Sequence, residues 1–402
     1  MKRFGPGLLV MAAFIGPGTV TTASKAGADF GFTLIWAILF SLVATLVLQE
    51  MAARLGLVTG KGLSAALRDS IDNRILRLLA VVLIILAIGL GNAAYESGNI
   101  SGASMALAAI TPYSSNLWAL VVGGIAFALL ASGRYRVVER GLIVLVLVMS
   151  VVFLTTMLMV LPDLGEMWRG LTRPSLPKGS MLTVMALIGT TVVPYNLFLH
   201  SSAVREKWPA TVPVDEALSE SRRDSVLSIG LGGLITLAIV TTAAAAFFGS
   251  DTAFSAATIS QQLEPLLGPA AKYFFAIGLL AAGLTSAVTS PLAAAFAVSG
   301  ALGWPADLTD RRFKAVWIVV LGCGMLAAAL GSRPISAIMF AQAANGFLLP
   351  IVAVYLLYVM NSTRLLGDYK NRWRSNIVGV LVVLVVSGLG LFKLLQVFGL
   401  GT

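Results

Sequence analysis

Two short motifs combine residues that interrupt a helix with polar groups that can bind a small ion or solute. The first runs from Gly16 through Pro17 and Gly18 to Thr19, and the second covers residues 192–196. Proline removes a backbone donor and glycine permits an unwound backbone. Carbonyl and amide groups freed in this way must face a cavity or a partner, because lipid cannot satisfy them. Both motifs therefore indicate a binding site built partly from main chain.

Two titratable residues are candidates for moving protons. Glu96 lies inside an apolar stretch, where an ionisable group is costly and marks a pathway or an ion pair. His200 is the only histidine, and its side chain changes charge near neutral pH. We expect Glu96 to be the proton carrier and His200 to relay protons toward the cytoplasm. For each residue the alternative is a structural hydrogen bond between helices.

Two further charged pairs have a structural interpretation. Lys25 and Asp29 are four residues apart, as are Glu50 and Arg54. Residues at this spacing lie on the same helix face and can pair. We therefore expect ion pairs at both positions.

The composition excludes a soluble protein. Of the 402 residues, 58% are hydrophobic and 11% are charged, and the mean hydropathy is +0.91, whereas soluble domains carry about 25% charged residues. A single cysteine, Cys323, and a single histidine exclude a disulfide framework, a Cys/His zinc cluster and an iron–sulfur centre. No nucleotide-binding loop or nucleophile motif is present, so we expect neither an enzyme nor an ATP-driven pump. We expect no cofactor and no nucleic-acid partner.

Long apolar runs predict an all-α integral membrane protein. A transmembrane helix needs about 20 apolar residues. Eleven runs approach this length, at residues 6–28, 31–54, 78–106, 116–132, 138–161, 181–203, 225–249, 268–301, 314–331, 336–360 and 376–400. Most Lys and Arg residues fall in the loops on the side of the N-terminus. The positive-inside rule then places the N-terminus in the cytoplasm and the C-terminus outside.

The two interrupted runs occupy matching places in the chain. If spans 1–5 and 6–10 form two halves, the odd number of spans inverts the second half, and the interruptions fall in the first span of each. Paired interruptions of this kind indicate a transporter binding site. We predict one transmembrane domain, 1–402, with inverted repeats at about 6–161 and 181–360 and an extra helix at 376–400. The alternative is that both prolines only kink their helices.

At these residues the sequence resembles the Nramp family of divalent-metal transporters. Residues 15–28 look like the family's first-helix motif, residues 48–63 like the end of its second helix, and residues 189–202 like its sixth-helix motif. The resemblance implies a leucine-transporter-type 5+5 inverted repeat with broken helices 1 and 6. It also implies alternating access and, commonly, proton-coupled uptake of manganese or iron. Glu96 matches an acidic residue of the family's third helix that is associated with the proton route, and His200 matches a His that the family retains in its sixth helix.

The sequence departs from the family at the metal site itself. The family's metal-binding Asp and Asn align with Gly16 and Thr19, its Met with Val193, and a His with Tyr195; its carbonyl ligand aligns with Thr190. The resemblance implies the following substrate-binding candidates: Gly16, Gly18, Thr19, Thr190, Val193, Tyr195, Asn196 and Asn345. Every side-chain ligand of the family is replaced, so the sequence identifies no metal-binding residue set.

The missing carboxylate leads to our main functional expectation. The free N–H groups at half-helix N-termini carry partial positive charge and favour anionic groups. We therefore expect a secondary transporter for a small anion such as bicarbonate or a small carboxylate, and not for a transition metal, whose selection needs soft ligands. One alternative is a divalent cation transporter for Mg or Mn, with a partly hydrated ion held by Glu96, Glu50 or Asn345. Another is a non-transporting sensor.

The expected setting is the plasma membrane. The partners are then the lipid bilayer and a small solute or ion, and we expect the chain to act as a monomer.

Overall fold

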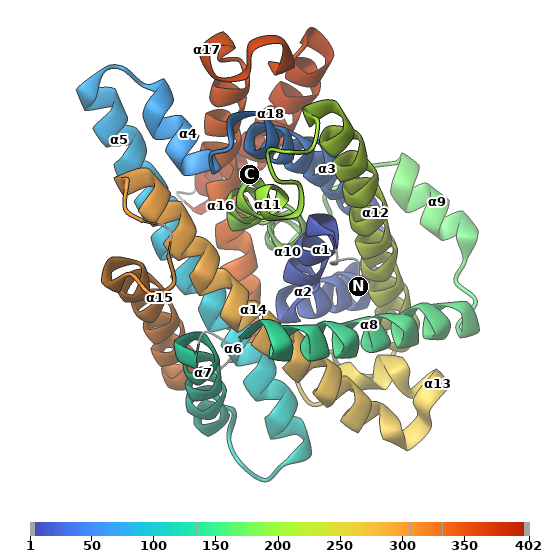
Figure 1. Ribbon diagram of the computed structural model, residues 1–402. Helices are drawn as coiled ribbons and strands as arrows, with labels where there is room; N and C mark the ends of the chain where they lie inside the picture. Colours follow the sequence, from blue (N-terminus) through green and yellow to red (C-terminus); the bar gives the residue numbers. More distant parts are fainter. Residues whose placement is uncertain (1–4, 133–134, 306, 332, 398–402) are drawn as a thin grey trace.

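The chain folds into helices only, in the residues that the computed structural model describes, which are 5–132, 135–305, 307–331 and 333–397 (Figure 1). The all-α prediction is confirmed. The α-helices are α1 Pro6–Phe14, α2 Pro17–Phe30, α3 Ile35–Thr59, α4 Leu63–Ser70, α5 Arg74–Ile84, α6 Gly91–Ile110, α7 Ser115–Ser132, α8 Tyr135–Met159, α9 Leu164–Thr172, α10 Met181–Thr191, α11 Pro194–Lys207, α12 Val214–Phe247, α13 Glu264–Leu267, α14 Ala271–Leu302, α15 Arg311–Leu330, α16 Pro334–Met360, α17 Thr363–Leu366 and α18 Trp373–Val397.

The helices follow the predicted apolar runs, with one difference in the count of spans. Within the described ranges, nine helices are long and apolar enough to cross a membrane, and the pair α8 and α9, which is bent by 112°, raises the number to ten. The first predicted run is not among these spans; it forms the two helices α1 and α2, of 9 and 14 residues. Residues 398–400 of the last predicted span lie outside the described residues.

Both predicted interruptions are present and have the same local geometry. The residue that caps the C-terminus of α1, Ile15, has φ −82° and ψ 66°, and the one that caps α10, Val192, has φ −92° and ψ 67°. The next residue in each case, Gly16 or Val193, is extended, and the following helix begins with a proline. Proline at the first helical position needs no N–H partner. The chain therefore stops and restarts a helix at both sites, which is more than a kink.

The four half-helices α1, α2, α10 and α11 lie in the middle of the molecule, surrounded by the longer helices (Figure 1). Close backbone approach is built in by glycine. A β-carbon on Gly27 of α2 would stand 2.2 Å from the carbonyl oxygen of Val240 on α12, and one on Gly189 of α10 would stand 2.0 Å from that of Gln342 on α16. Small residues let membrane helices pack at this distance.

The two predicted ion pairs are present. Lys25 Nζ lies 2.8 Å from Asp29, and Arg54 lies 3.1 Å from Glu50. Glu50 also accepts hydrogen bonds from Arg222 of α12, at 2.8 Å for the shorter one. Neither Lys25 nor Glu50 is therefore left as an isolated charge inside the protein.

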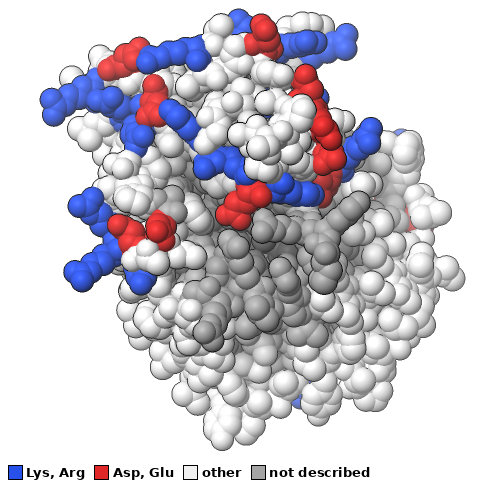
Figure 2. Space-filling view, in the orientation of Figure 1, with Lys and Arg blue, Asp and Glu red and all other residues white. Residues whose placement is uncertain are grey.

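Charged side chains are unevenly distributed over the visible face. Figure 2 shows Lys, Arg, Asp and Glu gathered in the upper part of the view, over α4, α5 and α17, and over the loop before α15, whereas the lower part is almost uncharged. An uncharged surface of this kind suits lipid, and a charged end suits water. The sidedness of the two termini and the limits of the two repeats stay predictions.

Candidate functional site

The two helix breaks meet through a pair of threonine hydroxyls. Thr19 Oγ1, in the first turn of α2, lies 2.8 Å from Thr190 Oγ1 at the end of α10. Both residues are fully buried. The Thr19 hydroxyl also donates to the carbonyl oxygen of Phe14, which the break leaves without a helical donor. In the bond between the two threonines, either hydroxyl can be the donor.

Neighbouring helices occupy the space beside the two glycines of the first break. A β-carbon on Gly16 would stand 2.8 Å from Ser286 Oγ of α14, and one on Gly18 would stand 2.1 Å from Gln342 Nε2 of α16. Both polar side chains are buried. The region where a side chain at position 16 would project is thus taken by a neutral hydroxyl.

Several buried polar groups near the breaks have no partner. Among the described residues, no hydrogen bond reaches the amide groups of Asn196 and Gln342, the Nδ2 atom of Asn345 or the hydroxyl of Ser286. Each unsatisfied buried group of this kind costs about 1–3 kcal/mol. A concentration of such groups at one place indicates that a ligand or water binds there.

Ser286 and Gln342 did not emerge as candidates from the sequence. Gln342 precedes Asn345 by three residues and so shares its face of α16. This spacing could have identified it. Nothing in the sequence brings Ser286 of α14 to Gly16, because that contact depends on tertiary packing.

Tyr195 and Val193 fill space beside the breaks. The Tyr195 hydroxyl lies 3.5 Å from the carbonyl oxygen of Ala13, a long contact, and its ring stacks edge-on with Tyr95 at a centroid distance of 5.3 Å. Val193 is buried in the main hydrophobic core and has no polar side-chain atom. Position 193 can therefore contribute only its backbone to a ligand.

Glu96 lies at the contact between α6 and α15. Its Oε2 atom accepts a hydrogen bond of 3.2 Å from Asn99, and its Oε1 atom has no partner among the described residues. Gly324 of α15 packs on its side chain, since a β-carbon there would stand 2.5 Å from Glu96 Cγ. No hydrogen bond joins Glu96 to Thr19 or Thr190, so the structure does not bring it into the threonine pair.

His200 is bonded across to α3. Its Nδ1 atom lies 2.9 Å from Gln49 Oε1, and its Nε2 atom has no partner in the described part of the chain. The bond to Gln49 corresponds to the structural alternative, while the free nitrogen leaves a position for proton exchange. Gln49 is a partner that the sequence alone did not reveal.

The described residues do not form a cluster of acidic, His or Cys side chains that would bind a cation strongly. The described ranges contain no group of three or more His, Cys, Asp or Glu residues close enough to hold a metal ion. The oxygen atoms around the breaks belong to hydroxyls, amides and carbonyls, all of which are neutral. Any cation bound here would keep part of its water shell.

A buried polar centre between two broken helices is typical of transporters with the leucine-transporter-type fold. Solved structures support the fold. A point mutant of the Eremococcus coleocola manganese transporter matches with a TM-score of 0.76 at 23% identity, covering 98% of this chain and 86% of that one. The nucleobase-cation symporter Mhp1 in a closed conformation matches with a TM-score of 0.57 at 15% identity, covering 99% and 94%.

Sequence comparisons identify the family. The model of the Natural resistance-associated macrophage protein-like (Nramp) family matches residues 7–396. A divalent metal cation transporter MntH of Deinococcus radiodurans is 28% identical over 404 residues, covering 98% of this chain and 90% of the relative. A Klebsiella pneumoniae protein of the same name is 29% identical, covering 96% and 92%. The chain belongs to the Nramp family and is a multi-pass membrane transporter.

Proposed function

We propose that this chain carries a divalent metal cation, Mg²⁺ or Mn²⁺, across the plasma membrane with part of the ion's water shell retained. The divalent cation is the alternative substrate in our sequence analysis, but the donors proposed here differ from the Glu96, Glu50 or Asn345 expected there. The observation that carries it is the Thr19–Thr190 pair, whose oxygen atoms lie 2.8 Å apart where the two breaks meet. The curated relatives, which are named divalent metal cation transporters, favour this hypothesis over our anion hypothesis.

The chemistry of the donor set supports a hard ion. Mg²⁺ binds oxygen ligands, dehydrates reluctantly and needs few protein groups. Two hydroxyls, Thr19 and Thr190, and the amide groups of Asn196 and Gln342 supply neutral oxygen. The thioether that would favour a soft ion is absent at Val193. We therefore propose that selection of transition metals over Mg²⁺ is weak.

The anion hypothesis receives no support from a positive side chain. Lys25 is the cation nearest in sequence to the first break, and it is paired with Asp29 at 2.8 Å, with about a third of each side chain exposed. The half-helices α2 and α11 both begin with proline, which removes one of the free N–H groups that an anion would use. The oxygen atoms that remain around the two breaks are neutral, and this does not favour an anion.

We further propose that transport follows alternating access, is coupled to protons through Glu96, and occurs in the monomer. Glu96 supports the coupling because it is fully buried with one oxygen unpartnered. The N-terminus is proposed to be cytoplasmic on the basis of the Lys and Arg bias.

The test is a flux panel in proteoliposomes with Mg²⁺, Mn²⁺, bicarbonate and acetate, each against protein-free vesicles. Saturable uptake of a divalent cation, with no uptake of either anion, is the expected result. Anion uptake without cation uptake would contradict the proposal and restore the anion hypothesis. Absence of all flux, with specific Mg²⁺ or Mn²⁺ binding to folded protein, would instead favour a non-transporting sensor.

A further inference from the structure

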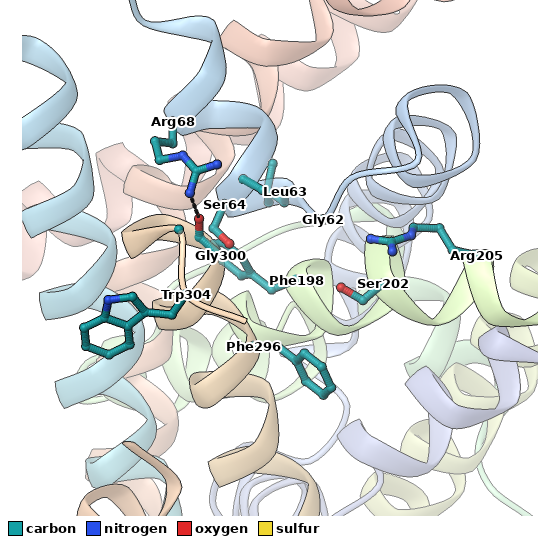
Figure 3. A pocket seen from close by; sticks show the side chains of 12 residues that line it. Gly62, Leu63, Ser64, Arg68, Phe198, Ser202, Arg205, Phe296, Gly300 and Trp304 are labelled. Carbon is teal, nitrogen blue, oxygen red and sulfur yellow. Dashed lines mark hydrogen bonds between the residues drawn. The ribbon is translucent and has the colours of Figure 1, made fainter. Parts of the chain in front are cut away.

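A second polar cavity lies at the charged end of the molecule, between α4, α11 and α14 (Figure 3). Its volume is about 220 Å³, and its lining includes Ser64, Arg68, Ser202, Arg205 and Gly300. None of these residues belongs to the candidate transport site. The share of liquid volume taken by one water molecule is about 30 Å³, so the cavity has room for a small tetrahedral anion and several waters.

The cavity carries excess positive charge. Arg68 donates to the carbonyl oxygen of Gly300 at 3.1 Å and pairs with Asp69 at 3.0 Å. Asp69 is shared, because Lys61 also lies 2.6 Å from it. Arg205 has no ion pair or hydrogen bond to any described residue, and in Figure 3 it extends from α11 toward Gly62 and Ser202. The lining of the cavity therefore includes two guanidinium groups and no carboxylate.

The start of α4 contributes donors from the backbone. Its first residue follows Gly62, which makes no side-chain cap. The amide of Leu63 donates to Ser201 Oγ at 3.1 Å. The amides of Ser64 and Ala65, in the first turn, have no acceptor within the helix. Free amides at a helix N-terminus and the helix dipole both favour an anion.

A buried, unpartnered hydroxyl points to a ligand independently of the helix end. Ser64 is 4% exposed, yet its side chain forms no hydrogen bond with any described residue. Figure 3 shows the hydroxyls of Ser64 and Ser202 pointing into the cavity from opposite sides. Two hydroxyls, two guanidinium groups and free amides then surround one space.

We propose that this cavity binds a phosphate group, supplied either by a free phosphate ion or by the headgroup of an anionic phospholipid. Guanidinium groups and backbone N–H groups are strong donors to phosphate oxygens. Arg205 supplies the unpaired charge, Ser64 and Ser202 supply hydroxyl donors, and Arg68 stays anchored to Gly300. The bound group would join α4 to α11, one of the half-helices that form the transport site.

The experiment uses the full chain in phosphatidylcholine nanodiscs, whose headgroup phosphate is neutralised by choline. Thermal unfolding is followed against inorganic phosphate, with chloride at equal ionic strength as the reference, and separately in nanodiscs that also contain phosphatidylglycerol. The variants are Arg205→Gln and Ser64→Ala. Arg223→Gln is the matched control, since Arg223 is an exposed arginine of α12 without a partner in the described residues.

The expected result is a saturable rise in melting temperature with phosphate, with phosphatidylglycerol, or with both, and the arm that responds identifies the source of the phosphate group. Arg205→Gln should raise the ligand concentration at half-saturation about tenfold, because one charge-assisted hydrogen bond is lost. Ser64→Ala should also raise the ligand concentration at half-saturation. The melting temperature without ligand should be unchanged or higher, because the variant removes a hydroxyl that has no partner in the free protein. Arg223→Gln should change neither value.

Two results would overturn the proposal. One is that neither phosphate nor phosphatidylglycerol stabilises the protein beyond its reference. The other is that Arg223→Gln weakens the response as much as Arg205→Gln, which would show general surface electrostatics.

Discussion

The hydroxyl oxygen of Ser286 lies 2.8 Å from the point at which a β-carbon on Gly16 would stand. The side chain of Ser286, on α14, therefore occupies the region into which a carboxylate at position 16 would project. A carboxylate cannot be restored at position 16 unless Ser286 gives way. Position 16 and Ser286 therefore share one region and can be tested together.

The double variant Gly16→Asp with Ser286→Gly should tighten Mn²⁺ binding by at least about tenfold, because it adds a charged ligand where only neutral oxygen is present. Isothermal titration with Mn²⁺ and Mg²⁺ measures the effect. Gly16→Asp alone should destabilise the protein, since its β-carbon would be too close to Ser286. Unchanged Mn²⁺ affinity in a folded double variant would show that position 16 does not face the ion.

Gly18→Ala should lower cation uptake several-fold with little loss of stability. The added methyl would stand 2.1 Å from Gln342 Nε2, which is the movable end of a long side chain, so the amide shifts away from the site and the fold survives. Uptake and melting temperature should be measured on the same preparation. The matched control is Gly124→Ala in α7, where a β-carbon meets nothing within 4 Å. A fall in uptake equal to that of the control would argue against a role for Gln342.

Glu96→Gln should separate proton movement from cation uptake. In the wild type, a pH-sensitive dye inside the vesicles should report acidification that accompanies Mn²⁺ entry, because Glu96 is the buried carboxyl proposed to carry the proton. The variant should take up Mn²⁺ without acidification. Acidification at the wild-type rate in the variant would assign Glu96 to the structural alternative, a hydrogen bond to Asn99 at 3.2 Å.

The contribution that Asp69, on α4, makes to the stability of the protein should depend on pH. Burial raises the pKa of Asp69, but hydrogen bonds and charge from Lys61 and Arg68 outweigh it, so that the pKa lies below its ordinary value. A carboxyl with a depressed pKa stabilises the folded state above the unfolded-state pKa of about 3.9, and this is lost as pH falls through the folded-state value.

Asp69→Asn should therefore lower the melting temperature by a constant amount between about pH 5 and pH 8. The difference from the wild type should begin to shrink as the pH falls below the unfolded-state pKa of about 3.9, and it should vanish once the pH is below the lower folded-state pKa of Asp69. A difference that persists unchanged in acid would mean that the variant acts through packing and not through charge.

The sequence predicted the parts of the fold that depend on local chemistry. The breaks at Gly16 and Val193 follow from glycine and proline in otherwise apolar runs. The Lys25–Asp29 and Glu50–Arg54 pairs follow from spacing on one helix face. Of the eleven predicted runs, nine or ten correspond to spans among the described residues, and the run that is interrupted at Gly16 is the one not counted.

The composition of the site was harder to predict. The sequence shows which ligands are missing at positions 16 and 193, but not which side chains from other helices take their place. Ser286 and Gln342 reach the first break only through the packing of α14 and α16. Because the sequence does not place these neutral groups at the break, the partial positive charge of the helix N-termini is the main electrostatic feature that it predicts there, and this feature favours an anion.

The most direct test of the central claim is Mg²⁺ uptake by the wild type and by Thr19→Val, Thr190→Val and the double variant in proteoliposomes. Valine keeps the shape of threonine and removes the hydroxyl. Because the two oxygen atoms act together at 2.8 Å, the account predicts that each single variant loses about tenfold in apparent affinity and that the double variant loses less than the sum of the single effects. Uptake unaffected by any of the three variants would contradict the account.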